Sequence, residues 1–262
     1  MIKSILKPIY YSALKLGIDF RKMLSFLVFF PKFLIEYLSF FFKQKSSVTK
    51  FKIKINPQLQ DRFSQAGETK SHYFWQDLLV AKKIIENDVK NHFDIGSRID
   101  GFIAHLAASG IETNIFDIRK FDDKIPNVTF KQLDLMNPIP EKYINYCNSL
   151  SCLHTLEHFG LGRYGDEIDP DGHIKGIDQI FKILKKDGIL YLSVPVGVER
   201  VEFNAHRVFD VKTFYTNIQE KFNLLEFILI DDNCNVRTFK EVDNNNFSNL
   251  NYSCGIYILK KK

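Results

Sequence analysis

Glycines and acids recur in this sequence where short apolar runs end. Gly96 and Gly101 follow such a run, in the segment Asp94-Ile-Gly-Ser-Arg-Ile-Asp-Gly101. Glycines at such a turn let the backbone approach a ligand closely, and a helix beginning at Gly101 would offer free N–H groups to it. Asp117 ends the next apolar run, about 20 residues after Gly96, where an acid can accept hydrogen bonds from ribose hydroxyls. These residues predict a site for a ribose-containing ligand.

Further residues complete this candidate site. Asp134 ends the third apolar run and is placed to reach the adenine edge of the ligand, and Ser97 lies in the glycine turn itself. Asp94 either organises the turn or meets an ammonium group of the ligand. Ordinary strand-end polarity would explain each acid alone, but their placement after successive strands favours a binding site. Phe102 stands where a P-loop has lysine, and G-x-G-x-x-G is absent, which disfavours an ATPase and a classical NAD enzyme.

A second group of polar residues suits proton transfer. His154, Glu157 and His158 follow the fourth apolar run, and His206 and Arg207 follow the fifth. In a parallel sheet both positions open onto the edge where ligands bind. Histidine titrates near neutral pH, so we expect His158 or His206 to act as general base, with Glu157 orienting it and His154 as a further candidate. We expect Arg207 to bind an anionic group of the substrate. The alternative is that the histidines only satisfy backbone groups at a helix start.

Strand and helix patterns alternate along the chain after residue 70. This alternation predicts an α/β fold with an open, mostly parallel sheet covered by helices on both faces. The expected strands are 92–95, 113–116, 128–133, 146–153, 189–194, 224–230 and 252–259, and the expected helices are 72–89, 101–109, 174–186 and 211–221. The last two strands are joined by a polar connector instead of a helix, and the long loop 163–173 is a candidate wall of a substrate pocket.

Residues 1–45 form an apolar and basic extension. Its polar residues make narrow stripes on a helix, which favours one or two helices lying in a membrane interface. A helical cap packed on the protein's own core is the second alternative. A membrane span is the third, because Lys32 and Glu36 would be costly inside a bilayer. Residues 46–70 are interpreted as a linker and residues 71–262 as the sheet domain.

Composition excludes other classes of site. The net charge of +5 is concentrated before residue 55 and in the last three lysines, which fits an anionic membrane surface more readily than nucleic acid, so no nucleic-acid partner is expected. The four cysteines include no C-x-x-C pair, which argues against a zinc or redox site and for reduced thiols in a cytosolic protein. The acids before His173 lack the spacing of a calcium loop, so no metal is expected.

Four motifs carry a resemblance to a known family. They are FDIGSRIDGFIAHLA, IFDIR, LSCLHTLEHFGLGRYGDEIDPDG and LKKDGILYLSVPVG. Over residues 70–235 the sequence resembles the DUF268 group of methyltransferase-like proteins and, more broadly, is similar to class I S-adenosylmethionine (SAM)-dependent methyltransferases. The resemblance implies a Rossmann-like, seven-stranded fold with SAM as cofactor, held by Gly96, with Asp117 on its ribose and Asp134 on its adenine. The loop G-S-R-I-D-G departs from the usual G-x-G-x-G of that superfamily.

The resemblance also carries an expectation about the reaction. It implies O-methylation of a sugar or lipid-linked glycan precursor in surface polysaccharide synthesis. The expected location is the cytoplasm, peripheral on the inner membrane face through residues 1–45. The alternative is a non-catalytic SAM-fold protein that acts as a scaffold in a membrane-associated glycan assembly complex.

Overall fold

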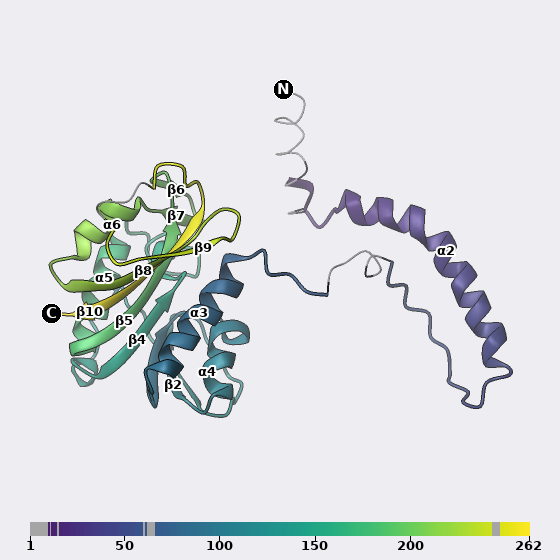
Figure 1. Cartoon of the computed structure of the whole chain (residues 1–262), viewed down its shortest axis with the longest axis horizontal. Coiled ribbons are helices and arrows are strands. Elements are labelled where there is room, and N and C mark those ends of the chain that lie inside the picture. Colours follow the sequence, from purple (N-terminus) through teal and green to yellow (C-terminus); the bar gives the residue numbers. More distant parts are fainter. Residues whose placement is uncertain (1–9, 11, 15, 60, 62–65, 243–246) are drawn as a thin grey trace, which may run out of the picture. The chain divides into compact units, whose positions relative to one another are not determined.

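The computed structural model describes the chain except for residues 1–9, 11, 15, 60, 62–65 and 243–246 (Figure 1). Its internal contacts divide the chain into two compact units, Met1–Glu68 and Thr69–Lys262. Each unit is described separately.

The first unit is dominated by one long helix, α2 (Phe20–Gln44), which contains Pro31 without ending there. The part from Lys22 to Gln44 is long and apolar enough to cross a membrane, by length and composition alone. Large apolar side chains are exposed along it, among them Leu27 and Ile35. The membrane contact predicted for residues 1–45 stays a prediction, and residues 1–9, 11 and 15 of that segment lie outside the described residues.

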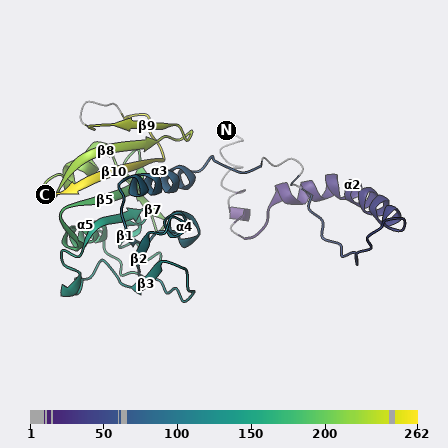
Figure 2. The ribbon, with the colours of Figure 1, turned by 60° about the horizontal axis from the view of Figure 1, so that its bottom comes forward.

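An eight-stranded sheet forms the centre of the second unit. The strand order is β3-β2-β1-β4-β5-β10-β8-β9, and Figure 2 shows β3 at one edge and β9 at the other. The bounds are β1 (Asn91–Ile95), β2 (Glu112–Asp117), β3 (Val128–Gln132), β4 (Cys147–Leu153), β5 (Leu184–Val196), β8 (Phe222–Ile230), β9 (Val236–Phe239) and β10 (Ser253–Lys261). β1 to β5 pair in parallel, whereas β10 runs antiparallel to both β5 and β8.

This arrangement confirms the predicted Rossmann-like methyltransferase fold, with a correction to the strand count. Five parallel strands are followed by an antiparallel insertion, in which β10 lies between β5 and β8. The eighth strand is β9, which pairs with β8 as a short edge strand of mostly exposed residues. A separate two-stranded hairpin consists of β6 (Arg200–Glu202) and β7 (His206–Val208). Strands of three or four residues carry too little periodicity to be predicted from the sequence.

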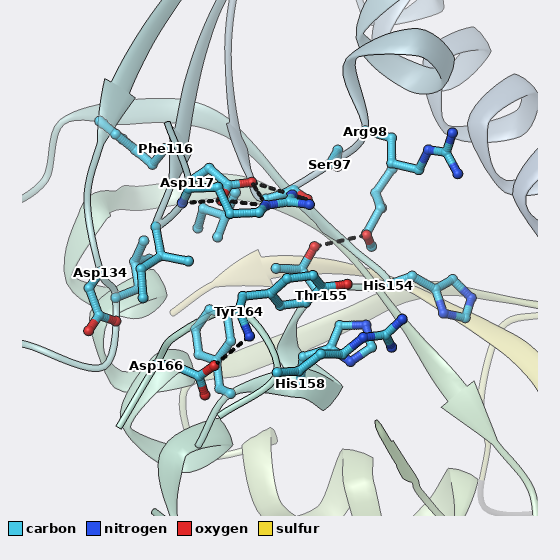
Figure 3. Close-up of a pocket in the computed structure, with 18 of the residues that line it drawn as sticks. Ser97, Arg98, Phe116, Asp117, Asp134, His154, Thr155, His158, Tyr164 and Asp166 are labelled. Atoms are coloured by element: carbon cyan, nitrogen blue, oxygen red, sulfur yellow. Dashed lines mark hydrogen bonds and ion pairs between the residues drawn. The ribbon is translucent and has the colours of Figure 1, made fainter. Parts of the chain in front are cut away.

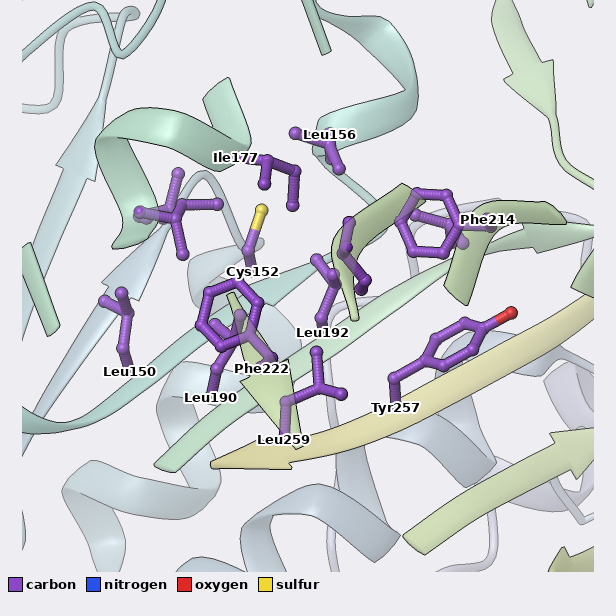
Figure 4. Packing of buried hydrophobic residues seen from close by; sticks show 14 of the residues in the cluster. Leu150, Cys152, Leu156, Ile177, Leu190, Leu192, Phe214, Phe222, Tyr257 and Leu259 are labelled. Atoms are coloured by element: carbon purple, nitrogen blue, oxygen red, sulfur yellow. The ribbon is translucent and has the colours of Figure 1, made fainter. Parts of the chain in front are cut away.

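Helices cover both faces of the sheet and create two apolar cores. Because side chains alternate along a strand, Leu190 and Leu192 of β5 lie in one core while Tyr191 lies in the other. The first core packs against α5 (Gly172–Ile183) and α6 (Val211–Ile218), as Figure 4 shows for Ile177 and Phe214. The second core packs against α3 (His72–Glu86) and α4 (Ala104–Ala108). Burial on both faces explains why most residues of the central strands β1 and β4 are buried, polar ones included.

All four predicted helices end before their predicted last residues, and the structure gives the reason for two of them. The helix expected at 101–109 is an irregular turn over Ile99–Ile103, in which Gly101 has φ −122° and ψ −105°, followed by only five residues of α4. The helix expected at 174–186 ends at Ile183, because Leu184 already pairs with Cys147 of β4. The first error arises where Gly101 leaves helical backbone angles, and the second where strand pairing overrides local helix preference at the helix end.

Candidate functional site

A pocket opens at the carboxyl ends of the parallel strands (Figure 3). Its wall is formed by the turn after β1, the ends of β2 and β3, the first turns of α3, and the loop between β4 and α5 (residues 154–171, called the β4–α5 loop). The cavity volume is about 110 Å³, which is smaller than the roughly 300–1,000 Å³ of typical small-molecule sites.

The glycine turn has one glycine in the pocket and one outside it. Gly96 lines the pocket with φ +71°, and a Cβ there would stand 2.3 Å from Cγ2 of Thr155. Left-handed backbone and this close approach both require glycine. Gly101 does not line the pocket. It lies against α3, where a Cβ would meet Oδ2 of Asp77 at 2.4 Å. The predicted role of Gly101 in holding a ligand is therefore corrected: the missing side chain of Gly101 leaves room for Asp77 of α3.

Asp94 organises the turn and does not face the pocket. It is fully buried and accepts hydrogen bonds from the backbone N–H (2.9 Å) and the hydroxyl (2.7 Å) of Ser97, and from Ser151. Burial raises the pKa of its carboxyl to about 6. Of the two predicted roles, the structure supports the organising one, and Ser97 is the member of this pair that lines the pocket.

A buried chain of hydrogen bonds, which sequence reasoning missed, leads from Ser149 through His92 and Ser151 to the carboxylate of Asp94. His92 lies between two serines, with Nδ1 2.7 Å from Oγ of Ser149 and Nε2 2.8 Å from Oγ of Ser151. Because Ser151 donates to the Asp94 carboxylate, its oxygen must accept from Nε2–H of His92, and Ser149 then donates to Nδ1. Burial lowers the pKa of His92 to about 3, which keeps the ring neutral.

Asp117 lines the pocket at the end of β2 and is bound by a neighbour along the chain. The backbone N–H of Arg119 donates to Oδ1 (2.8 Å), its Nε contacts Oδ1 (3.0 Å) and Oδ2 (3.2 Å), and its Nη2 contacts Oδ2 (2.5 Å). Nη2 also donates to the Gly96 carbonyl at 3.4 Å. The guanidinium lies over the ring of Tyr164, 4.8 Å from its centroid. Arg119 thus joins the turn after β1, the end of β2 and the β4–α5 loop.

Asp134 lines the pocket beyond β3. Its oxygens accept hydrogen bonds from the N–H of Met136 (2.9 Å) and from Nδ2 of Asn137 (2.8 Å), which fix a turn. Leu133, Leu135 and Met136 place apolar surface next to the carboxylate. An acid beside an apolar wall suits one edge and one face of a planar base, so the adenine role predicted for Asp134 stays a prediction.

Glu157 lies between two histidines in the β4–α5 loop. Its Oε1 is 3.0 Å from Nδ1 of His154 and 3.7 Å from Nε2 of His158. All three residues are buried, and both histidines line the pocket. Among the described residues, Oε2 of Glu157 has no hydrogen-bond partner. The structure therefore brings together three of the residues predicted for proton transfer.

The pKa values of the two histidines are shifted in opposite directions. Burial lowers the pKa of His158, so its ring is neutral at pH 7, and Nδ1 donates to the Ala205 carbonyl at 2.7 Å. The lone pair of a neutral ring is then on Nε2. For His154, burial disfavours the charged form, but the neighbouring Cys254 and Glu157 outweigh it and hold the pKa well above its ordinary value. Nε2 of His158 is therefore free to accept a proton, whereas Nδ1 of His154 is held by Glu157 at 3.0 Å.

His206 and Arg207 do not line this pocket, which corrects their predicted roles. His206 lies on the β6–β7 hairpin, where Nε2 is 3.5 Å from Oε2 of Glu202. Arg207 is buried, and its guanidinium donates to the carbonyls of Glu157 (3.3 Å), Phe159 (2.6 Å), Asp169 (3.4 Å) and Pro170 (3.0 Å). With both terminal nitrogens bonded to backbone carbonyls, Arg207 fastens the β4–α5 loop, and its guanidinium lies outside the pocket where an anionic substrate group was expected.

Several pocket residues were missing from the predicted site. Arg119 follows Asp117 by two positions, a signal that local charge pairing could have revealed. Tyr73 of α3 lines the pocket, with its ring 5.1 Å from the ring of His154. Arg163 and Tyr164 line the pocket from the loop that the sequence offered as a wall, and the binding of a substrate there stays a prediction.

Comparisons with known proteins return distant structural neighbours. No curated protein matches the sequence. Among solved structures, a 1,6-didemethyltoxoflavin-N1-methyltransferase of Burkholderia thailandensis is 13% identical with a TM-score of 0.46, over 74% of this chain and 80% of that one. The N-methyltransferase NodS of Bradyrhizobium japonicum is 13% identical with a TM-score of 0.47, over 71% and 85%. The [4+2]-cyclase SpnF is 14% identical with a TM-score of 0.46, over 60% of this chain and 61% of the cyclase.

The family comparison gives a match within the second unit. Residues 104–226, less than half of the chain, match the family described as "Caenorhabditis protein of unknown function, DUF268". That description assigns no activity, so the match identifies relatives without identifying a reaction. The resemblance to DUF268 that the sequence motifs predict is confirmed over residues 104–226, in a chain with the Rossmann-like class I methyltransferase fold.

Proposed function

We propose that this protein is a SAM-dependent methyltransferase that methylates a hydroxyl group of its acceptor. The observation that carries the proposal is a single pocket lined by Gly96, Asp117, Asp134 and the neutral imidazole of His158. A candidate nucleoside site and a candidate general base therefore line the same pocket, which is the combination that methyl transfer to a hydroxyl needs.

The residues present fit the nucleoside part of SAM. Asp117 offers a buried carboxylate for ribose hydroxyls once Arg119 releases it, and Asp134 with its apolar neighbours offers an edge and a face for adenine. Gly96 exposes backbone where a side chain would intrude. SAM would supply an electrophilic methyl group, and the protein would supply orientation and proton transfer.

His158 is assigned the general base. Its Nδ1–H is held by the Ala205 carbonyl, which leaves Nε2 to accept the acceptor hydroxyl proton. The carboxylate of Glu157, 3.7 Å from Nε2, would stabilise the imidazolium that forms. His154 holds that carboxylate in place through its Nδ1, 3.0 Å from Oε1. His154 and Glu157 are thus positioning residues in this mechanism.

The acceptor class is proposed from the motif resemblance. We infer a sugar or lipid-linked glycan precursor, with α2 holding the enzyme at the inner membrane face. The exposed apolar side chains of α2 and its basic residues support a membrane contact. A polar acceptor also agrees with the mixed charged and aromatic residues of the β4–α5 loop that line the pocket.

One observation favours the alternative of a non-catalytic scaffold: the ribose-binding acid is already paired with Arg119. A transfer assay separates the two functions. Purified protein is incubated with SAM carrying a labelled methyl group and a panel of nucleotide sugars and lipid-linked sugars. The enzyme proposal expects label in at least one acceptor with the wild type and loss of that label with His158→Gln. SAM binding without transfer to any acceptor would favour the scaffold.

A further inference from the structure

The ion pair between Asp117 and Arg119 lies where a cofactor ribose would bind. We propose that Arg119 closes the nucleoside end of the pocket in the cofactor-free protein and is displaced when the ribose hydroxyls bind Asp117. This inference rests on the proposed function, because it names the event by which SAM enters the same site.

The hydrogen-bonding capacity of Asp117 carries the argument. A carboxylate offers about four lone-pair sites. Arg119 makes four contacts with Asp117, two on each oxygen, all between 2.5 and 3.2 Å. Ribose hydroxyls and this guanidinium therefore cannot both be satisfied by Asp117, so binding must be an exchange.

Burial decides which partner moves. The side chain of Asp117 is 9% exposed, whereas that of Arg119 is 46% exposed. The guanidinium can swing into water at small cost, because half of it is solvated already. A buried carboxylate left without partners would be costly, so Asp117 requires the incoming hydroxyls to replace the lost contacts.

The exchange reaches the acceptor side of the pocket through Tyr164. The Arg119 guanidinium lies over the Tyr164 ring, and that ring in turn packs edge-on against His158 at 5.3 Å between centroids. When Arg119 leaves, Tyr164 loses a cation–π partner next to the general base. Cofactor binding is thereby coupled to the position of the β4–α5 loop, and the cofactor is expected to bind before the acceptor.

The test is the affinity of full-length protein for S-adenosylhomocysteine, measured by calorimetry. Removal of the competing guanidinium in Arg119→Ala should tighten binding about fivefold, the scale of a half-exposed ion pair. Lys120→Ala is the matched control: it removes the same charge from the adjacent residue, which lies outside this pocket, and should stay within about twofold of the wild type. Equal or weaker binding by a folded Arg119→Ala variant would overturn the proposal.

Chemical replacement of the side chain gives a second readout. Guanidinium chloride at about 10 mM should weaken binding by Arg119→Ala, compared with equal sodium chloride, and leave the wild type unchanged, because only the variant has the vacant site on Asp117. An identical response of both proteins would contradict the exchange. If S-adenosylhomocysteine binds neither folded protein, the proposed function fails and the exchange fails with it; if it binds the wild type more tightly than the variant, only the exchange fails.

Discussion

His158 carries the proton-transfer half of the proposal at the scale of single residues. Its neutral ring must accept a proton, and burial lowers its pKa. The rate should therefore be constant above the ordinary histidine pKa of 6.5 and fall only at lower pH, as the ring becomes protonated. His158→Gln should reduce kcat about 10²- to 10⁴-fold. Its affinity for SAM should be unchanged. A wild-type rate in this variant would remove His158 from the mechanism.

Asp94 has a separate pH signature in stability. Its folded pKa of about 6 lies above the ordinary aspartate pKa of 3.8, so the folded state binds the proton more tightly than the unfolded state. This group therefore favours folding below pH 4, and the favourable contribution is lost as pH rises through 6. The stability difference between wild type and Asp94→Asn should shift against the wild type by up to about 3 kcal/mol between pH 4 and pH 7.5. Urea unfolding at both pH values measures it, and a difference independent of pH would contradict the assignment.

Arg207 fixes the β4–α5 loop through hydrogen bonds to its backbone carbonyls. It joins four carbonyls of the β4–α5 loop to β7, and the loop in turn places His154, His158 and Tyr164 at the pocket. Arg207→Met would leave several carbonyls without donors and should destabilise the second unit by about 3 kcal/mol. Arg237→Met on the exposed edge strand β9 is the control and should cost under about 1 kcal/mol. Similar losses in chemical unfolding would argue against the fastening role.

Sequence patterns predicted the elements better than the side-chain directions within the site. The apolar runs located every strand of the parallel sheet, because each strand carries apolar residues that pack into one of the two cores. They also put Gly96, Asp117 and Asp134 at the correct sheet edge. Arg207 was misassigned because a residue after a strand faces the pocket or the protein interior according to loop geometry that has no periodicity. Arg119 was missed although it follows Asp117 by two residues, because its other partners, the Gly96 carbonyl and the Tyr164 ring, are distant in the sequence.

The predicted contact of the whole molecule with a membrane depends on the exposed apolar residues of α2. Leu27 and Ile35 are 72% and 69% exposed, and replacing both with serine leaves the charge of the helix unchanged. Flotation with anionic liposomes should recover the wild type with the vesicles and lose most of the Leu27→Ser/Ile35→Ser variant, because buried apolar area drives interfacial binding. Val201→Ser, an equally apolar exposed site in the second unit, is the control. Equal flotation of all three proteins would remove α2 as the membrane contact.

The central claim is that the pocket at the carboxyl ends of β1, β2 and β4 binds SAM. Calorimetric titration of the full-length protein with SAM tests it most directly, with Asp117→Ala as the paired variant. The account predicts one SAM per chain. Affinity should fall at least about tenfold in the variant, since the buried carboxylate is proposed to accept hydrogen bonds from the ribose hydroxyls. No heat of binding at millimolar SAM, or equal affinity in the two proteins, would contradict it.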